Sequence, residues 1–169
     1  MSMHSIFMRE IERLRRLLIG MGISYEDGED ILQEVYLEAL QRPPKHGSPH
    51  ENARWLMKVT INKCMLEFRQ KKQQQRAEKG ISQRRADLNK TQPAPESRVI
   101  HNEETQAMRH CLDEMEESLK VPLVMKYFCD LNSSQISEIL ELKPGTVRKR
   151  LCQGRLILAE MLLKKGIKP

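Results

Sequence analysis

Residues 132–151 read NSSQISEILELKPGTVRKRL, and this stretch decides how the C-terminal part of the chain folds. Residues 133–140 have the apolar spacing of a short amphipathic helix, and Asn132 before them is a residue type that caps helices. A tight connection then leads to Pro144, a residue favoured in the first turn of a helix. The stretch therefore predicts a helix-turn-helix, with its second helix over residues 144–165.

The second helix has one side for packing and another for contact with a ligand. At about 100° per residue, four residues lie within about 60° of one another and predict the buried side: Val147, Leu151, Gly154 and Leu158. The other positions carry Thr146 at the N-terminal tip, then Arg148, Lys149, Arg150, Cys152, Gln153 and Arg155. Arginine, lysine and glutamine read base edges and bind phosphates, so we predict a DNA-binding helix. Lys143 stands at the N-cap position, where a side chain with a hydrogen-bond acceptor is expected, and a lysine side chain has none.

The charge is distributed in blocks along the chain. Residues 1–70 carry ten basic and ten acidic side chains, 71–100 carry eight and three, 101–142 carry three and nine, and 143–169 carry eight and one. A surface charged only for solubility would not separate the signs in this way. Two basic blocks around an acidic one predict two contacts with a polyanion, and acidic faces that meet a different partner.

Helical periodicity dominates the first half as well, and no alternating strand pattern is present. The pattern predicts helices over residues 6–21, 25–40 and 49–75. Ser24 can cap the second of these. The third has the strongest start signal, because Ser48 can act as N-cap, Pro49 stands in the first turn, and Glu51 follows three residues after the cap.

A polar, basic segment separates the two halves. Residues 76–102 bury too little apolar surface to fold alone, and we predict that they form a flexible linker between a first domain, 1–75, and a second, 103–169. Helices over 103–117 and 121–129 are predicted before the helix-turn-helix. The expected fold class is all-α, with two small helical domains joined by a flexible basic linker.

Several function classes fit this sequence poorly. No apolar run is long enough to span a membrane, and the first residues lack the apolar stretch of a signal peptide, so we expect a cytoplasmic protein with no membrane partner. His110 and Cys111, with His101 nearby, are too few for a metal site, and we expect no metal, cofactor or small-molecule substrate. No nucleophile–base pair is recognisable, so no enzyme activity is expected.

Together these segments resemble the sigma factors of bacterial RNA polymerase. The helix-turn-helix is similar to the C-terminal domain of the sigma-70 superfamily. Residues 27–40 (DGEDILQEVYLEAL) resemble its polymerase-binding helix, and residues 54–62 (RWLMKVTIN) resemble its promoter-melting helix. The order, spacing and linker match the compact extracytoplasmic-function (ECF) class. The resemblance spans residues 6–75 and 103–163, and it implies a subunit that directs promoter-specific transcription initiation.

The resemblance also implies partners for each surface. Four residues would dock on the clamp helices of the largest subunit of core RNA polymerase: Asp30, Gln33, Glu34 and Glu38. The second domain would meet the flap of the second-largest subunit. An anti-sigma factor is the usual further partner in the family.

Promoter DNA would be contacted twice. The −35 duplex would be read by Thr146, Arg148, Lys149, Arg150, Gln153 and Arg155. The single-stranded −10 element would lie along one side of the melting helix, formed by Lys58, Asn62, Arg69 and Arg76, where cations hold phosphates and an amide can pair with a base. The preceding loop, residues 43–52 with His46 and His50, would capture a flipped-out base, and binding would supply the free energy of unstacking without ATP.

The chain departs from the family's pattern at several of these positions. Ser137 replaces a small apolar residue, and Lys149 stands in place of a frequent serine. Gln153 and Cys152 stand where a basic and an aromatic residue are common. The loop over residues 43–52 lacks the aromatic residue often found there. The preferred −35 sequence is therefore not expected to be that of its relatives.

A protein of another class could also carry the helix-turn-helix. An autonomous DNA-binding regulator that never contacts polymerase would explain the second half of the chain, but it leaves the acidic helix and the side chain of Asn62 without a function. Copurification with core polymerase would separate the two hypotheses. Trp55 likewise has two interpretations, as a core residue or as a wedge against a base.

Overall fold

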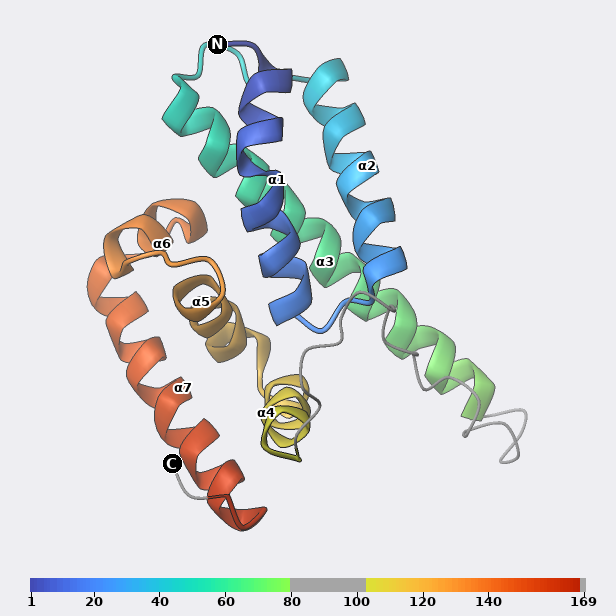
Figure 1. Ribbon diagram of the computed structural model, residues 1–169, viewed down its shortest axis with the longest axis vertical. Coiled ribbons are helices and arrows are strands. Elements are labelled where there is room, and N and C mark those ends of the chain that lie inside the picture. The colour runs from blue at the N-terminus through green and yellow to red at the C-terminus, as the bar shows by residue number, and fades with distance from the viewer. Residues whose placement is uncertain (80–102, 168–169) are drawn as a thin grey trace.

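The computed structural model of the protein describes residues 1–79 and 103–167. Within these ranges the chain forms seven α-helices and no strand, as the all-α prediction requires (Figure 1). The first group of helices consists of α1 (Met3–Gly20), α2 (Tyr25–Gln41) and α3 (Pro49–Lys79). The second consists of α4 (Glu103–Glu114), α5 (Glu117–Tyr127), α6 (Ser133–Leu140) and α7 (Pro144–Lys164).

The predicted helix starts are confirmed by their hydrogen bonds. The backbone N–H of Asp27 donates to the Ser24 hydroxyl at 3.2 Å, which begins α2. At the start of α3 the Glu51 N–H donates to the Ser48 hydroxyl at 3.2 Å, and the Ser48 N–H donates to the Glu51 carboxylate at 2.7 Å. Asn132 and Gln135 form the same reciprocal arrangement at α6. Such a capping box satisfies N–H groups that the first helical turn leaves without partners.

The first group packs around α1. Leu14, Leu18 and Met21 are buried on its inner side. Leu17 is also fully buried because α1 contacts both α2 and α3. Glu10 is buried as well, and its carboxylate accepts hydrogen bonds from Arg9 and Arg13, each at 3.1 Å.

Three predicted boundaries are wrong. Helix α3 continues to Lys79, so residues 76–79 of the predicted linker are helical, and the remaining linker residues lie outside the described ranges. In the second group α4 ends at Glu114, and α5 begins at Glu117 and contains Pro122 well inside it. Proline in a helix interior removes one backbone hydrogen bond. Here the cost is offset by burial, because all seven residues from 119 to 125 are buried.

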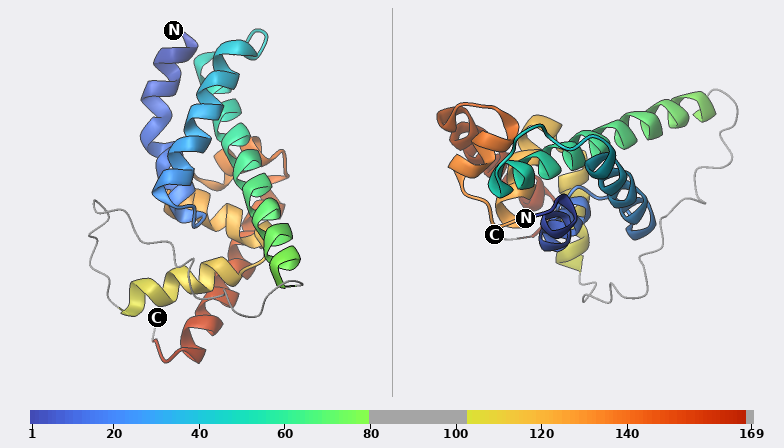
Figure 2. Two further views of the ribbon diagram at one scale, coloured as in Figure 1. Left: turned by 90° about the vertical axis from the view of Figure 1, so that its right-hand side faces the viewer. Right: turned by 90° about the horizontal axis from the view of Figure 1, so that it is seen from above.

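The two groups of helices pack directly against each other, as the views in Figure 2 show. At the end of α1, the Arg109 guanidinium on α4 donates to the carbonyl oxygens of Ile19 and Gly20, both at 2.8 Å. The Ile19 carbonyl also accepts from the Gly22 N–H at 3.0 Å, and a cation at this end of α1 complements the helix dipole. Buried side chains form one continuous core through both groups. No pattern in the sequence predicted this contact, and the division into two domains remains a prediction.

Glycine positions in α2 and α7 generate a test of the packing. A Cβ at Gly154 would lie 2.9 Å from Leu123 Cδ1, whereas a Cβ at Gly28 would meet nothing closer than 3.7 Å. Alanine favours a helix over glycine by about 1 kcal/mol, and overpacking costs about 1–3 kcal/mol. We expect Gly28→Ala to raise the free energy of unfolding in urea and Gly154→Ala to lower it. An equal rise in both variants would contradict the close packing of α7 on α5.

Candidate nucleic-acid and partner interfaces

Helix α7 presents a polar face because its opposite face is fixed by packing. Val147, Leu151 and Gly154 are buried and Leu158 packs against the core, as predicted. Gly154 allows α7 to approach Leu123 of α5 closely. Lys143 precedes the helix in extended conformation and its side chain makes no capping hydrogen bond. The orientation of α7 therefore depends on its apolar side and on Pro144, which favours a helix start.

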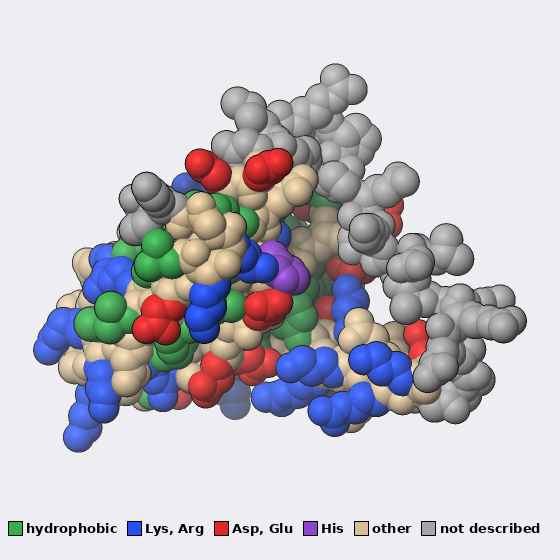
Figure 3. Space-filling model, turned by 90° about the horizontal axis from the view of Figure 1, so that it is seen from below, with side chains coloured by type: hydrophobic (Ala, Val, Ile, Leu, Met, Phe, Trp, Pro, Cys, Tyr) green, Lys and Arg blue, Asp and Glu red, His purple; other side chains and the backbone are tan. Residues whose placement is uncertain are grey.

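The predicted duplex-reading side chains lie on that polar face. Arg148, Lys149, Gln153 and Arg155 are exposed, and Thr146 and Arg150 are half-buried. The Arg155 guanidinium donates to the Tyr127 hydroxyl at 3.1 Å, which raises the pKa of the arginine. In Figure 3, Lys and Arg side chains gather at the left edge, on the side of α7, and in a second group on the side of the α3 end. Acidic side chains lie between the two groups.

The predicted polymerase-docking residues share the outer face of α2. Asp30, Gln33 and Glu34 are exposed, and Glu38 is half-buried. The Lys63 ammonium of α3 lies 3.6 Å from the Glu34 carboxylate and 3.0 Å from that of Glu38. The face is therefore open at its N-terminal end and partly paired at its C-terminal end.

Two leucines beside these carboxylates were not part of the prediction. Leu37 is 54% exposed and Leu40 is 49% exposed. Exposed apolar side chains next to charged ones are typical of a protein–protein interface. Both leucines lie off the buried stripe of α2, and this offset is a signal that the sequence already contained.

The predicted single-strand face of α3 is only partly free. Asn62, Arg69 and Arg76 are exposed. In contrast, the Lys58 ammonium forms an ion pair of 2.7 Å with the carboxylate of Glu141, the C-cap residue of α6. That hydrogen bond lowers the pKa of Glu141, so its carboxylate is charged near neutral pH.

The loop before α3 and its first turn hold the remaining predicted residues. His46 is exposed and has a φ of 69°, in the left-handed region. His50 Nε2 lies 3.5 Å from the Glu138 carboxylate, which also accepts from Arg54 at 3.2 Å. Trp55 is half-buried and packs against the core, which favours its interpretation as a core residue.

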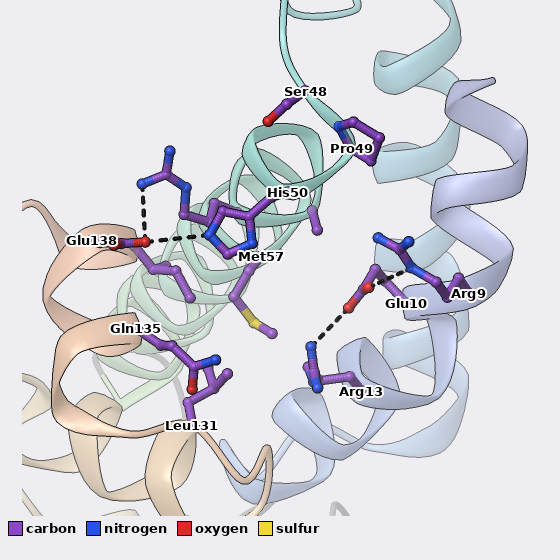
Figure 4. A pocket seen from close by; sticks show the side chains of 13 residues that line it. Arg9, Glu10, Arg13, Ser48, Pro49, His50, Met57, Leu131, Gln135 and Glu138 are labelled. Atoms are coloured by element: carbon purple, nitrogen blue, oxygen red, sulfur yellow. Dashed lines mark hydrogen bonds and ion pairs between the residues drawn. The ribbon is translucent and has the colours of Figure 1, made fainter. Parts of the chain in front are cut away.

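A pocket of about 440 Å³ lies between the two groups of helices (Figure 4). Helix α1 contributes Arg9, Glu10 and Arg13 to it, and the start of α3 contributes His50 and Arg54. The facing wall comes from α6 and the loop before it, with Leu131, Gln135, Glu138 and Ile139. Its charges pair across short distances, arginine to Glu10 on one side and to Glu138 on the other. The pocket is therefore a seam between the two groups, lined by paired charges.

Lys120 is an unexpected buried cation at the same contact. It is 5% exposed, and its ammonium lies 3.8 Å from the Asp113 carboxylate and 4.8 Å from the centre of the Phe68 ring of α3. Burial lowers the pKa of Lys120 because desolvation disfavours the charged form. Its position inside the apolar run over residues 119–125 was the signal in the sequence.

Metal and membrane features complete the description. Over residues 1–79 and 103–167, no cluster of three histidine, cysteine or acidic side chains could hold a metal ion. His110 pairs with Glu114 at 2.8 Å, and His101 lies outside these ranges. None of the helices in the described part of the chain is long and apolar enough to cross a membrane.

The chain is similar to known sigma factors over most of its length. Residues 105–158 match the family described as Sigma-70, region 4. The chain is 22% identical to the ECF RNA polymerase sigma factor SigW of Bacillus subtilis, over 89% of this chain and 83% of that protein. It is 26% identical to a probable RNA polymerase sigma factor, RfaY, of Xanthomonas campestris, over 81% of this chain but only 34% of that protein.

A solved structure shows the same fold. Sigma factor RpoE, in its complex with the anti-sigma factor NepR from Bartonella quintana, superimposes with a TM-score of 0.61 at 18% identity. The match covers 88% of this chain and 89% of RpoE. The region 4 match over residues 105–158, the similarity to SigW along most of the chain and the fold shared with RpoE together support an extracytoplasmic-function sigma factor of the sigma-70 superfamily.

The buried Lys120 provides a test of the contact between the two groups of helices. Replacing a buried ion by an apolar residue of similar volume is often neutral or stabilising, by about 1–4 kcal/mol. We expect Lys120→Met to raise the free energy of unfolding at pH 7. Because the folded-state pKa of Lys120 is lowered, the wild-type chain gains stability as pH rises from that pKa toward the ordinary value of 10.5, and the difference between the two chains shrinks. Urea unfolding at several pH values measures this, and a constant difference would contradict a buried ammonium.

Proposed function

We propose that this sigma factor reads the −35 duplex with α7, holds the single-stranded −10 element on α3, and docks on the clamp helices of core polymerase through α2. The observation that carries the proposal is the polar face of α7, with Arg148, Lys149 and Gln153 exposed opposite a fully buried apolar side. A major groove admits one helix whose side chains reach base edges while its other side is held by a scaffold.

The −35 contact combines two kinds of side chain. Arg148 and Lys149, one turn into α7, are placed to reach base edges, and Gln153 lies about one turn further along the same face. Arg150 and Arg155 flank this face, where they would anchor phosphates on either side. Thr146 lies at the N-terminal tip, close to where the helix would enter the groove. Cys152 is exposed among these residues and gives the face a side chain that adds no charge.

The −10 contact follows the exposed side of α3. Asn62 offers an amide to a base edge, and Arg69 offers a cation to the phosphates about two turns further along. Lys58 would join them once it is free of Glu141. The exposed loop around His46 and the side chain of His50 lie at the N-terminal end of the same helix, where a flipped-out base would be held.

Polymerase would be contacted at both ends of the molecule. The outer face of α2 offers Asp30, Gln33 and Glu34 with the exposed Leu37 to the clamp helices. For the flap of the second-largest subunit, the C-terminal half of α7 offers an apolar surface with Leu156 62% exposed and Leu163 55% exposed. These two leucines are seven residues apart and so lie on one side of the helix.

The broader setting follows from the class of protein. A sigma factor acts where transcription takes place, so we place this chain in the cytoplasm. RpoE is bound by the anti-sigma factor NepR in the solved complex, and we propose that an anti-sigma protein likewise controls this chain. An autonomous regulator is not favoured, because the similarity to SigW covers 89% of the chain and thus extends well beyond the helix-turn-helix.

The −35 assignment predicts a separation of functions. We expect Arg148→Ala/Lys149→Ala to reduce run-off transcription from a −35-dependent promoter by at least about tenfold, since lost base contacts cost about 1–3 kcal/mol each. Binding to core polymerase should be unchanged. The matched control is Lys164→Ala/Lys165→Ala, which removes the same charge at the far end of α7. Loss of core binding in the first variant would show that the two surfaces are misassigned.

The docking assignment predicts the opposite pattern. We expect Asp30→Ala/Glu34→Ala to weaken the affinity for core polymerase by about tenfold or more, because two exposed carboxylates of the interface are removed. The melting temperature of the free chain should change little, because both side chains are exposed. Glu103→Ala/Glu104→Ala, in the exposed first turn of α4, is the control. An unchanged affinity in the α2 variant would refute docking through this face.

A further inference from the structure

The two carboxylates that cover α3 both belong to the helix-turn-helix. Glu138 lies on α6 and binds Arg54 and His50 at the first turns of α3. Glu141 ends α6 and binds Lys58 one turn further along. Glu138 is 46% and Glu141 74% exposed at the side chain, so water screens these pairs, and alone they would hold the two groups only weakly.

A close apolar contact also holds the two groups of helices together. The end of α1 touches α5 at Gly20, where a Cβ would lie 2.5 Å from Val124 Cγ1 and 2.8 Å from Phe128 Cγ. Arg109 fixes the same point by its two hydrogen bonds to the end of α1. Only glycine allows this approach, so a larger side chain at position 20 would push α1 and α5 apart.

We propose that the free chain inhibits itself, because the carboxylates of α6 occupy the cations of α3 that a single DNA strand needs. The phosphates of the strand and the two glutamates compete for Arg54 and Lys58. The N-terminal part of the −10 surface, around Lys58, becomes available only when the α1–α5 contact opens and carries α6 away, whereas Asn62, Arg69 and Arg76 further along α3 are already exposed. The duplex-reading side chains of α7 are exposed in the same closed structure, so the inhibition acts on one DNA contact and leaves the other open.

The inference rests on the proposed −10 role of α3, but the closed state can be tested without any DNA. A carbodiimide joins an amine to a carboxylate without a spacer, so it couples only groups in direct contact. Lys58 and Glu141 satisfy this condition at 2.7 Å, although 83 residues separate them. We expect mass spectrometry of the full, unbound chain to find the isopeptide bond between these two side chains, and the yield to fall when core polymerase is added.

Two kinds of variant open the seam by different routes. Gly20→Ala wedges α1 from α5, and Gly28→Ala is its matched control, since a Cβ at Gly28 has room. Glu138→Gln/Glu141→Gln removes the competing charges and keeps the side-chain size, and Glu160→Gln on α7 is its control. We expect Gly20→Ala to lose most of the isopeptide product, and Gly28→Ala to keep it.

Binding of DNA by the free chain provides the second measurement. The probe is a fluorescently labelled single-stranded 20-mer of mixed sequence. We expect Gly20→Ala and Glu138→Gln/Glu141→Gln each to bind it about tenfold more tightly than the wild-type chain, a difference of 1.4 kcal/mol. Gly28→Ala and Glu160→Gln should bind as the wild type does.

Two results would overturn the inference. One is the absence of the isopeptide bond in the wild-type chain, and the other is equal affinity of wild type and both opened variants for the strand. Failure of the proposed −10 contact would appear elsewhere, as undiminished transcription by polymerase carrying Asn62→Ala. The two failures are therefore distinguishable.

Discussion

The approach of α1 to α5 at Gly20 is the contact on which the arrangement of the two halves depends. It brings the end of α1 within reach of Arg109, places α6 over the first turns of α3, and encloses Lys120 beside Phe68. A single methyl group at Gly20 cannot be accommodated without movement of Val124 or Phe128. Because protein interiors are closely packed, the seam has few intermediate positions between closed and open.

The basic side chains of α7 and α3 differ in what surrounds them. On α7 Arg148 and Lys149 are exposed, whereas on α3 Arg54 and Lys58 are paired with carboxylates of the same chain. The sequence shows this only as alternating blocks of charge. The acidic block over residues 101–142 contains both glutamates of the seam, so part of its charge faces inward to the chain's own cations rather than toward another protein.

Local rules predicted the helices well and the contact between the halves not at all. Ser48, Asn132 and Val147 each act through neighbours a few residues away, so capping and periodicity place them correctly. The helix predicted over residues 121–129 begins earlier, at Glu117, because the cost of Pro122 inside it is offset by burial that only the tertiary structure supplies. Lys58 was predicted on the DNA-facing side of α3, but it is half-buried and paired with Glu141, 83 residues away, and no local pattern links the two. The residue assignments for DNA and polymerase remain predictions.

Glu141 carries a consequence for how this motif can change. Its φ of 55° lies in the left-handed region, where glycine fits without strain and a side chain costs roughly 1 kcal/mol or more. A glycine would make the turn between α6 and α7 more stable, yet it would release Lys58. The stability of the helix-turn-helix and the proposed inhibition of DNA binding in the unbound subunit thus both depend on Glu141, and they oppose each other. A more stable turn would give a subunit that is less inhibited before it binds polymerase.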